Sequence, residues 1–167
     1  MTTPVLFAFC LVSATLLCSL VAGFLLAFAV VAMPGIKNLG DREFIRAFQV
    51  IDGVIQNRQP VFIVIWLGSV LAVVASAALG LAQLEGTELL LLVSAVVAYL
   101  LGVQLPTFTV NVPLNNQLQT LDVNTADATA CQAVRMRFEA HWNRWNTIRT
   151  AFAVLVSVLL ILLSFKL

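Results

Sequence analysis

Four long stretches of the chain carry no charged side chain, and this placement constrains the fold more than any other feature. The stretches cover residues 1–36, 59–84, 89–121 and 150–165. A helix needs about 20 mainly apolar residues to cross the ~30 Å hydrocarbon core of a bilayer. The first three stretches are long enough. The fourth reaches this length if it extends upstream through Thr147. Arg149 would then either extend its charged end to the membrane surface or be buried beside a partner. The sequence therefore predicts four transmembrane helices.

Composition excludes the main alternatives to a membrane protein. Hydrophobic residues make up 61% of the 167 residues and charged residues only 10%, against roughly 25% in a soluble domain. A soluble domain of this length cannot bury so much apolar surface, and a disordered chain would not contain it. The net charge of +1 gives no strong field that would attract a nucleic acid.

The apolar runs are continuous and lack the alternation of barrel strands, so we predict an all-α membrane protein. Residues 1–167 are expected to form one domain, a four-transmembrane-helix bundle with amphipathic loop helices on one side. We place the spans at about 5–32, 61–83, 88–106 and 147–165, and the loop helices at about 41–57 and 113–146. The first span is too long for a signal peptide and lacks a basic start, so we expect it to be retained.

The Lys and Arg residues predict the topology. Nearly all of them lie in the two long loops: Lys37, Arg42, Arg46, Arg58, Arg135, Arg137, Arg144 and Arg149. Only Lys166 falls on the other side of the four spans. The positive-inside rule therefore places both long loops in the cytoplasm and both termini on the opposite side.

Few residues are suited to holding a metal or a haem. The cysteines, Cys10, Cys18 and Cys131, are odd in number and have no CxxC spacing, so we interpret them as small buried apolar residues. His141 is the only histidine in the chain. We therefore expect neither a metal nor a cofactor.

The first long loop contains an amphipathic helix that begins near Asp41. Its apolar face is formed by Phe44, Phe48, Ile51 and Ile55, and Asp52 lies next to that stripe. One interpretation is an interfacial helix that rests against the lipid headgroups. The other folds the helix over the mouth of the bundle, with Asp52 pointing inward. The pattern alone favours the first.

The third span ends at two prolines, Pro106 and Pro113, and Asn111 and Asn115 flank the second. Each proline removes a helical hydrogen-bond donor. Carboxamides in a charge-free stretch cost free energy unless they are hydrogen-bonded. The simplest interpretation, which the pattern slightly favours, is a helix break with asparagines that cap its ends. The functional one is a polar pocket at the end of the bundle.

The second long loop predicts a helix that continues toward the last span. Asn124 with Asp127 resembles an N-cap followed by an acidic residue at the third helical position. On this helix Trp142, Trp145 and Arg149 fall on one face. Tryptophans near the start of a span are usually interface residues, and that interpretation accounts for both of them.

Arg149 and Asn146 fit that interfacial interpretation less well, because they lie at the mouth of the last span. A guanidinium there should pair with a carboxylate or a carbonyl, and our candidate partners are Asp52 and Asp122. A lone histidine such as His141, beside Trp142, is more often a solvated or capping residue than a catalytic one, although it can act as a base near neutral pH.

Together these motifs resemble the four-helix membrane proteins of the DUF1772, or anthrone-oxygenase-like, family, over nearly the whole chain. The strongest marker is Asn-Val-Pro-Leu-Asn at residues 111–115. The second is Trp-x-x-Trp-Asn-x-x-Arg-Thr at residues 142–150. A first span that ends in Met-Pro and a loop helix that ends in FQVIDGVIQN also match. Thr147 is a departure, because a histidine often follows the Trp-Asn pair.

The resemblance implies oxygenation of an anthrone to an anthraquinone, with O₂ and a flat lipophilic aromatic or quinone-like molecule as partners and no cofactor. The anthrone carbon opposite the carbonyl is acidic, and its enolate reacts with O₂. Such a site needs a base, donors for the enolate oxygen and flat apolar walls. The candidates are Asp52 or His141 as base, Asn111, Asn115, Asn146 and Arg149 as donors, and Trp142 and Trp145 as walls. If that histidine is the base in the family, this chain lacks it, because Thr147 stands in its place. The chain would then use Asp52 or His141 as the base, or it would lack the activity.

The alternative is a non-catalytic membrane protein: a scaffold, a subunit of a larger complex or a binder of a lipophilic molecule. In that case the same asparagines, tryptophans and arginine join the loop helices to the bundle. A channel or transporter is less supported, because no span carries a charge in its middle. The substrate and the oligomeric state stay open, and a homo-oligomer is compatible with the sequence.

Overall fold

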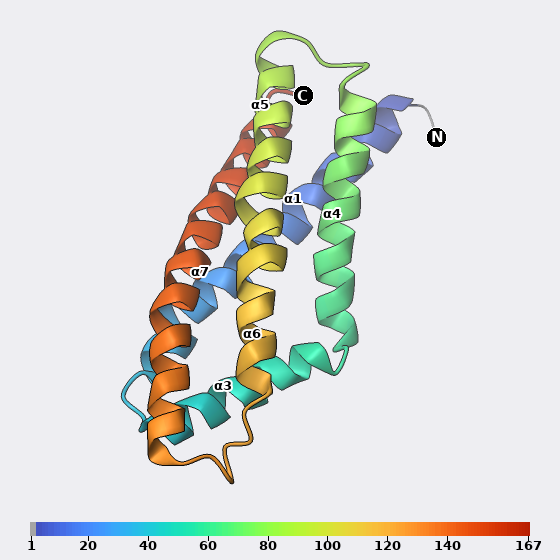
Figure 1. The fold of residues 1–167 in the computed structure, drawn as a ribbon. Helices are drawn as coiled ribbons and strands as arrows, with labels where there is room; N and C mark the ends of the chain where they lie inside the picture. The colour runs from blue at the N-terminus through green and yellow to red at the C-terminus, as the bar shows by residue number, and fades with distance from the viewer. Residues whose placement is uncertain (1–2) are drawn as a thin grey trace.

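The computed structural model describes residues 3–167, which form four long helices and one shorter helix (Figure 1). The helices long and apolar enough to cross a membrane are Thr3–Ile36, Pro60–Gly80, Gly86–Gln119 and Ala128–Ser164. Within residues 3–167 there is no strand. The predicted all-α fold with four membrane-length helices is therefore confirmed, and the chain is an integral membrane protein.

The first long helix is continuous through the predicted Met-Pro boundary. It comprises α1 (Thr3–Ala27), a wide π-helical turn η1 (Phe28–Ala32) and a last short turn α2 (Met33–Ile36). Pro34 falls at the start of α2, where a missing N–H group costs least. The second long helix, α4 (Pro60–Gly80), also begins at a proline, and the side chain of Gln59 caps it.

The third long helix does not break at its prolines, contrary to the simpler interpretation of the sequence. It comprises α5 (Gly86–Val97), the π-helical turns η2 (Ala98–Gln104) and η3 (Thr107–Asn111), and α6 (Val112–Gln119). The wide turns change the pattern of backbone hydrogen bonds around the two prolines, which have no N–H group to donate. Hydroxyl groups also bond to backbone carbonyls here: Thr107 Oγ1 donates to Val103 O at 2.7 Å.

The last long helix, α7 (Ala128–Ser164), has 37 residues and joins the later part of the predicted loop helix 113–146 to the fourth span. The earlier part of that range differs from the prediction, because residues 113–119 belong to α6 and residues 120–127 are not helical. The N-cap of α7 is Asp127, whose carboxylate accepts from the backbone N–H of Ala130 at 2.7 Å. The sequence placed the cap at Asn124, which was wrong. Residues 122–126 instead form a turn in which the backbone N–H of Ala126 donates to Asp122 O.

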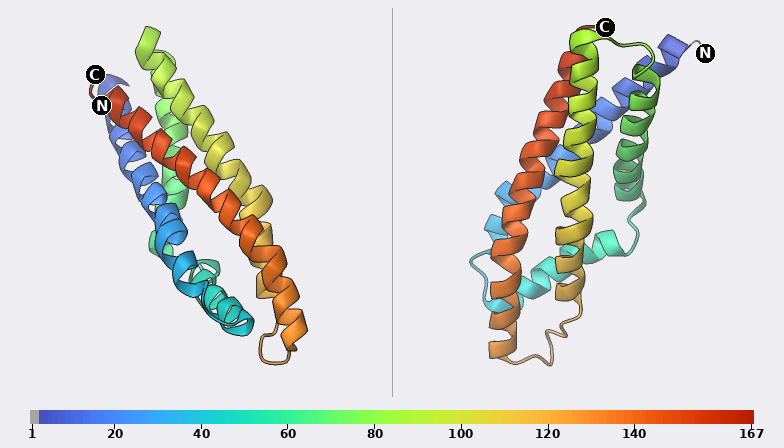
Figure 2. Two further views of the ribbon diagram at one scale, coloured as in Figure 1. Left: turned by 90° about the vertical axis from the view of Figure 1, so that its left-hand side faces the viewer. Right: turned by 45° about the horizontal axis from the view of Figure 1, so that its top comes forward.

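The four long helices pack as a bundle whose two ends differ. α1 packs against α4 and α7, and α5 with η2 packs against α7. Both termini lie at one end, and the helix α3 (Asp41–Gln56) lies at the other (Figures 1 and 2). Both loops predicted to share one side therefore meet at the α3 end. Cys18 and Cys131 are buried in the core.

α3 crosses beneath the bundle, so the less favoured interpretation of this helix matches the structure (Figure 1). Phe44, Ile45 and Phe48 are fully buried. The ring centroid of Phe48 lies 4.6 Å from that of Phe138 and 5.3 Å from that of Trp142. The apolar face of α3 thus packs on α7 rather than on lipid headgroups. This packing turns Asp52 inward, where it is 3% exposed.

Arginines hold the two long loops together at the α3 end. The guanidinium of Arg42 donates to the backbone oxygens of Val123 and Ala126. Arg135 donates to Lys37 O and Leu39 O at 2.6 and 2.8 Å. It also forms ion pairs with Asp41 and Glu139 at 3.1 and 2.8 Å. These bonds fix α3 against the start of α7.

Candidate functional site

A cavity of about 250 Å³ lies inside the α3 end of the bundle. Its walls are mainly apolar and aromatic: Phe24, Leu25, Phe28, Phe48, Ile55, Phe62, Trp66, Phe108, Val112 and Trp142. Its polar side chains are Asp52, Gln56, Thr107, Asn111, Asn115, Asn116, Asn146 and Arg149. Apolar walls with a few convergent polar groups are typical of sites that bind small molecules.

Asp52 is a buried carboxylate held by amides rather than by a cation. It accepts from Asn115 Nδ2 at 2.7 Å, from Gln56 Nε2 at 2.7 Å and from Gln119 Nε2 at 3.0 Å. Asn115 in turn accepts from the indole N–H of Trp142 at 2.7 Å. An ionised carboxylate has about four acceptor positions. Because three are used by these amides, about one is left for a ligand.

Arg149 is a buried guanidinium without a carboxylate partner, and it is 4% exposed. Its Nη1 donates to Thr107 Oγ1 and its Nη2 to Asn146 Oδ1, both at 2.9 Å. Its Cζ lies 5.9 Å from the ring centroid of Trp142. Its Nε–H group is buried and has no partner. Arg149, which lines the cavity, therefore keeps one donor that no other group uses.

The predicted carboxylate partners of Arg149 were wrong. Within residues 3–167 the ion pairs all belong to Arg135, so Asp52 and Arg149 face the same cavity unpaired. Asp52 is already surrounded by amide donors. Asp122 is in the exposed turn before α7, where the backbone N–H of Asn124 donates to it at 2.9 Å. That hydrogen bond holds the pKa of Asp122 below its ordinary value.

The asparagines connect the cavity to the surrounding helices. Asn146 Nδ2 donates to Leu25 O at 3.1 Å, which joins α7 to α1. Asn111 Nδ2 donates to Trp142 O at 3.3 Å, which joins η3 to α7. The buried Oδ1 of Asn111 has no partner. Asn111 therefore presents a free acceptor, as Arg149 presents a free donor.

A second polar cluster lies next to the cavity, between α4 and the third long helix. The indole N–H of Trp66 donates to Gln104 Oε1 at 3.1 Å. One turn further along α4, the hydroxyls of Ser69 and Tyr99 are hydrogen-bonded to each other. Trp66 also stacks on Phe62, with ring centroids 5.3 Å apart. These contacts fix the orientation of one aromatic wall.

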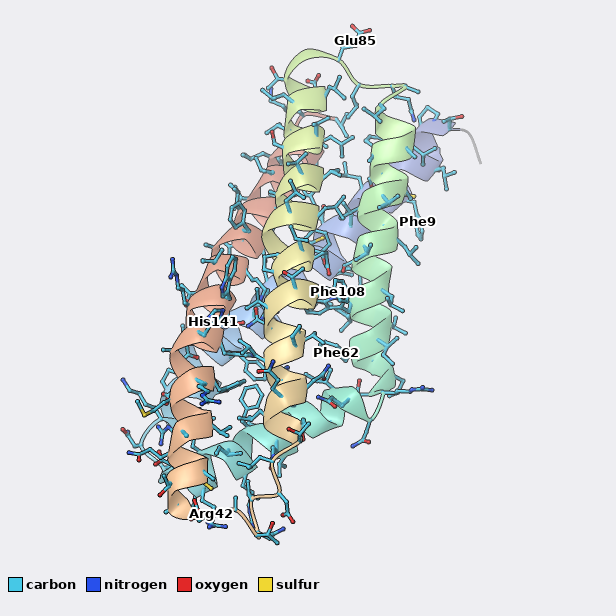
Figure 3. The ribbon with its side chains drawn as sticks, in the orientation of Figure 1. Phe9, Arg42, Phe62, Glu85, Phe108 and His141 are labelled. Atoms are coloured by element: carbon cyan, nitrogen blue, oxygen red, sulfur yellow. The ribbon has the colours of Figure 1, made fainter. Side chains whose placement is uncertain are left out.

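The structure brings together six of the eight residues that the sequence singled out: Asp52, Asn111, Asn115, Trp142, Asn146 and Arg149. It does not bring Trp145 and His141 to this cavity. His141 is exposed on α7 (Figure 3). Trp145 is half-buried. On a helix it is turned about 60° from Trp142, whereas Arg149 is turned only about 20°.

Position 147, where the resemblance implies that a histidine is often found, also lies away from the cavity. The side chain of Thr147 is exposed, and its hydroxyl donates to Asn143 O at 3.0 Å. It borders a separate surface depression with Met33 and Pro34. A histidine at this position would not line the cavity that holds Asp52 and Arg149.

Several residues that line the cavity or bond to Asp52 were not predicted from the sequence. Gln56 follows Asp52 by four residues, and Gln119 follows Asn115 by four, so helical spacing was an available signal. Thr107 and Trp66 had no such signal, because their partners Arg149 and Gln104 lie 42 and 38 residues away. Among residues 3–167, no group of three or more His, Cys, Asp and Glu side chains is placed to hold a metal ion.

These features define a four-helix integral membrane protein with a charge-bearing, aromatic-walled cavity beneath an amphipathic helix. A family model described as anthrone oxygenase matches residues 54–159, and the chain belongs to this family. The matched range contains both sequence motifs and begins just after Asp52. No curated protein and no solved structure gives a match.

Proposed function

We propose that the cavity binds a flat lipophilic aromatic ketone of the anthrone class and promotes its oxygenation by O₂. One observation carries the proposal: a buried carboxylate and a buried guanidinium, each without an ionic partner, line the same aromatic cavity. Unpaired charges are costly in such surroundings and commonly mark functional sites. Membership of the anthrone oxygenase family supports the same reaction class.

In the proposed mechanism, Asp52 accepts the acidic C–H proton of the bound anthrone, and the electron pair stays on the substrate as an enolate. The free Nε–H of Arg149 donates to the enolate oxygen. The ring of Trp142, which lies against Arg149 and is linked to Asp52 through Asn115, provides a flat wall.

The enolate then transfers electrons to O₂, and a C–O bond forms at the same carbon. Protonated Asp52 returns its proton to the resulting peroxide. Loss of water, with the remaining hydrogen of that carbon, leaves the second carbonyl. The anthrone is oxidised and O₂ is reduced, so one oxygen atom is retained in the anthraquinone and the other leaves as water.

The proposal is tested by O₂ uptake when the purified protein is mixed with an anthrone. We expect uptake above the uncatalysed rate, with the anthraquinone formed in equal amount. Asp52→Asn, which removes the proton acceptor, should lower the rate about 10²–10⁴-fold. Arg149→Gln should lower it about 10²–10³-fold, because a preorganised donor to the enolate oxygen is lost.

Matched substitutions at exposed positions provide the controls. Glu85→Gln changes the same functional group as Asp52→Asn but lies at the opposite end of the bundle (Figure 3). Arg144→Gln removes an exposed guanidinium of α7. Both should keep the wild-type rate. A wild-type protein with no uptake above background would overturn the catalytic proposal, as would full activity in folded Asp52→Asn protein.

A binding or scaffold function is the second candidate. It is favoured by the three amides that already bind Asp52 and by the bonds that tie Arg149 and Asn146 to neighbouring helices. This function predicts that the protein binds an anthraquinone without consuming O₂ in the presence of an anthrone. It also predicts that Asp52→Asn and Arg149→Gln lower stability or affinity only.

A further inference from the structure

We propose that the ligand of this cavity reaches it sideways from the bilayer, through an opening between α4 and the η3–α6 segment. We call this opening the lateral portal and define it by Phe62, Phe108 and Val112. The inference rests on the proposed function only in taking the ligand to be lipophilic. The route itself follows from which sides of the cavity are closed and which residues at its edge are exposed.

The axial route from water is closed by α3. Phe44, Ile45 and Phe48 are fully buried between α3 and α7. Beyond them, Asp52 is bonded to Asn115 and Gln119, which joins α3 to α6. A molecule that entered along the bundle axis would have to break this packing and these hydrogen bonds.

The side between α4 and η3–α6 is different, because cavity-lining residues there reach the outer surface. Phe108 is 61% exposed and Val112 is 37% exposed, yet both also line the cavity. Phe62 lines the cavity from α4 and is partly buried. The bond between Trp66 and Gln104 closes the upper edge of this opening, and α3 closes its lower edge.

The surface around the portal is suited to contact with lipid. Leu105 and Val64, on the two flanking helices, are apolar and exposed. Phe108 and Val112 lie in the charge-free stretch 89–121. A flat aromatic ketone partitions into lipid, because its apolar surface is removed from water there. Its concentration beside the portal therefore exceeds its concentration in water.

The lower edge of the opening, where the end of α3 meets α6, is polar. Gln56 and Asn116 line the cavity there, both are exposed, and Gln56 Nε2 donates to Asn116 Oδ1 at 3.4 Å. A molecule that comes from water would have to break this bond, which makes the edge the competing route. A ligand that lies in the membrane plane would enter edge-on between Phe62 and Phe108. The gap between these two rings would then select flat molecules over bulky ones.

The test uses tryptophan fluorescence in vesicles, in a Trp145→Phe background that leaves Trp66 and Trp142, both at the cavity. Phospholipids with brominated acyl chains quench tryptophans that the chains can reach, and acrylamide quenches those that water can reach. We expect quenching by the brominated lipid, and we expect Val112→Phe to reduce it several-fold. Gln117→Phe, at an exposed position of α6 that does not line the cavity, should leave it unchanged.

Val12→Phe makes the same change at an exposed position of α1 and is the matched control. Quenching by acrylamide that Asn116→Phe blocks, without quenching by lipid, would overturn the lateral portal and indicate an aqueous route. This result does not depend on catalysis, so an inactive protein with lipid-quenched tryptophans would refute the proposed function and keep the portal.

A second measurement follows the same variants with a dihydroxyanthraquinone as the probe. A gate alters the rates of association and dissociation by the same factor and leaves Kd unchanged. We expect Val112→Phe to slow both rates and Phe108→Ala to speed both. If instead Val112→Phe leaves both rates at their wild-type values, or changes Kd through only one of them, Phe108 and Val112 line the cavity without gating it and the lateral portal is refuted.

Discussion

Asn115 is the residue on which the hydrogen bonding of the cavity depends most. Its amide nitrogen donates to Asp52, and its amide oxygen accepts from the indole of Trp142, each at 2.7 Å. It therefore links α3, α6 and α7 through one side chain. Neither a carboxylate nor an aliphatic residue can make both bonds, because the position needs one donor and one acceptor.

Asn115→Leu should lower the free energy of unfolding by roughly 2–5 kcal/mol, because it leaves a buried carboxylate oxygen and an indole N–H without partners. The measurement is unfolding in mixed micelles followed by circular dichroism. Gln117→Leu is the control, since that side chain is exposed on the same helix, and its effect should stay within about 0.5 kcal/mol. Equal stability of the two variants would contradict this account.

Distance along the chain explains which partners could be predicted from sequence. Asn146, three residues before Arg149, was recognised as its neighbour from helical spacing, and the two are hydrogen-bonded. Thr107, the other partner of Arg149, lies on a different helix, and no pattern connects them. The same limit led to the wrong choice of Asp52 and Asp122 as partners. Charge suggests an ion pair, but only the packed fold determines which groups meet.

The π-helical turns keep the third long helix continuous, and one of them, η2, makes a close contact with α7. A Cβ atom at Gly102 would lie 2.3 Å from Cγ and 2.8 Å from Cβ of Phe152 on α7. These atoms are near the backbone of Phe152, so they cannot easily move aside. η2 therefore packs directly on α7, and the position requires glycine. Hydropathy predicted the apolar helix here, but a proline rule based on regular α-helices could not predict the wide turns.

Gly102→Ala should destabilise the protein by about 1–3 kcal/mol, because the added methyl group overpacks the contact with α7. Removing the opposing ring in the double variant Gly102→Ala/Phe152→Ala should restore part of the loss. Gly23→Ala is the matched control: outside the local backbone of its own helix, no atom lies within 4 Å of a Cβ placed there, so the change should be neutral or stabilising by up to about 1 kcal/mol. Unfolding in mixed micelles measures all three, and an equally stable Gly102→Ala protein would refute the close contact.

Across the whole molecule, charge placement alone predicted the number of membrane-length helices and the grouping of both long loops at one end. It could predict these because the bilayer excludes charge wherever the chain crosses it. It could not predict that α3 closes the bundle. An amphipathic helix with this pattern can pack either on lipid headgroups or on the apolar end of a bundle. The sequence alone does not show which packing has the lower free energy.

The orientation of the bundle remains our prediction, with the α3 end in the cytoplasm. A cysteine at Thr125, in the exposed turn before α7, should react with a membrane-impermeant maleimide only when the cytoplasmic face is accessible. A cysteine at Thr87, exposed at the opposite end, should show the reverse pattern and serves as the control. The opposite labelling pattern would invert the topology.

The unpaired charges of Asp52 and Arg149 have a consequence for the molecules that the cavity prefers. Placed on the walls of one cavity and opposite in sign, they act together as a fixed dipole whose net charge is zero. Its field is strong inside, where few mobile dipoles screen it, and it decays steeply toward the surrounding lipid. A guest with a carbonyl at one end and a polarised C–H bond at the other aligns with that field. A hydrocarbon of the same shape gains nothing from it, so anthracene should bind less tightly than anthraquinone.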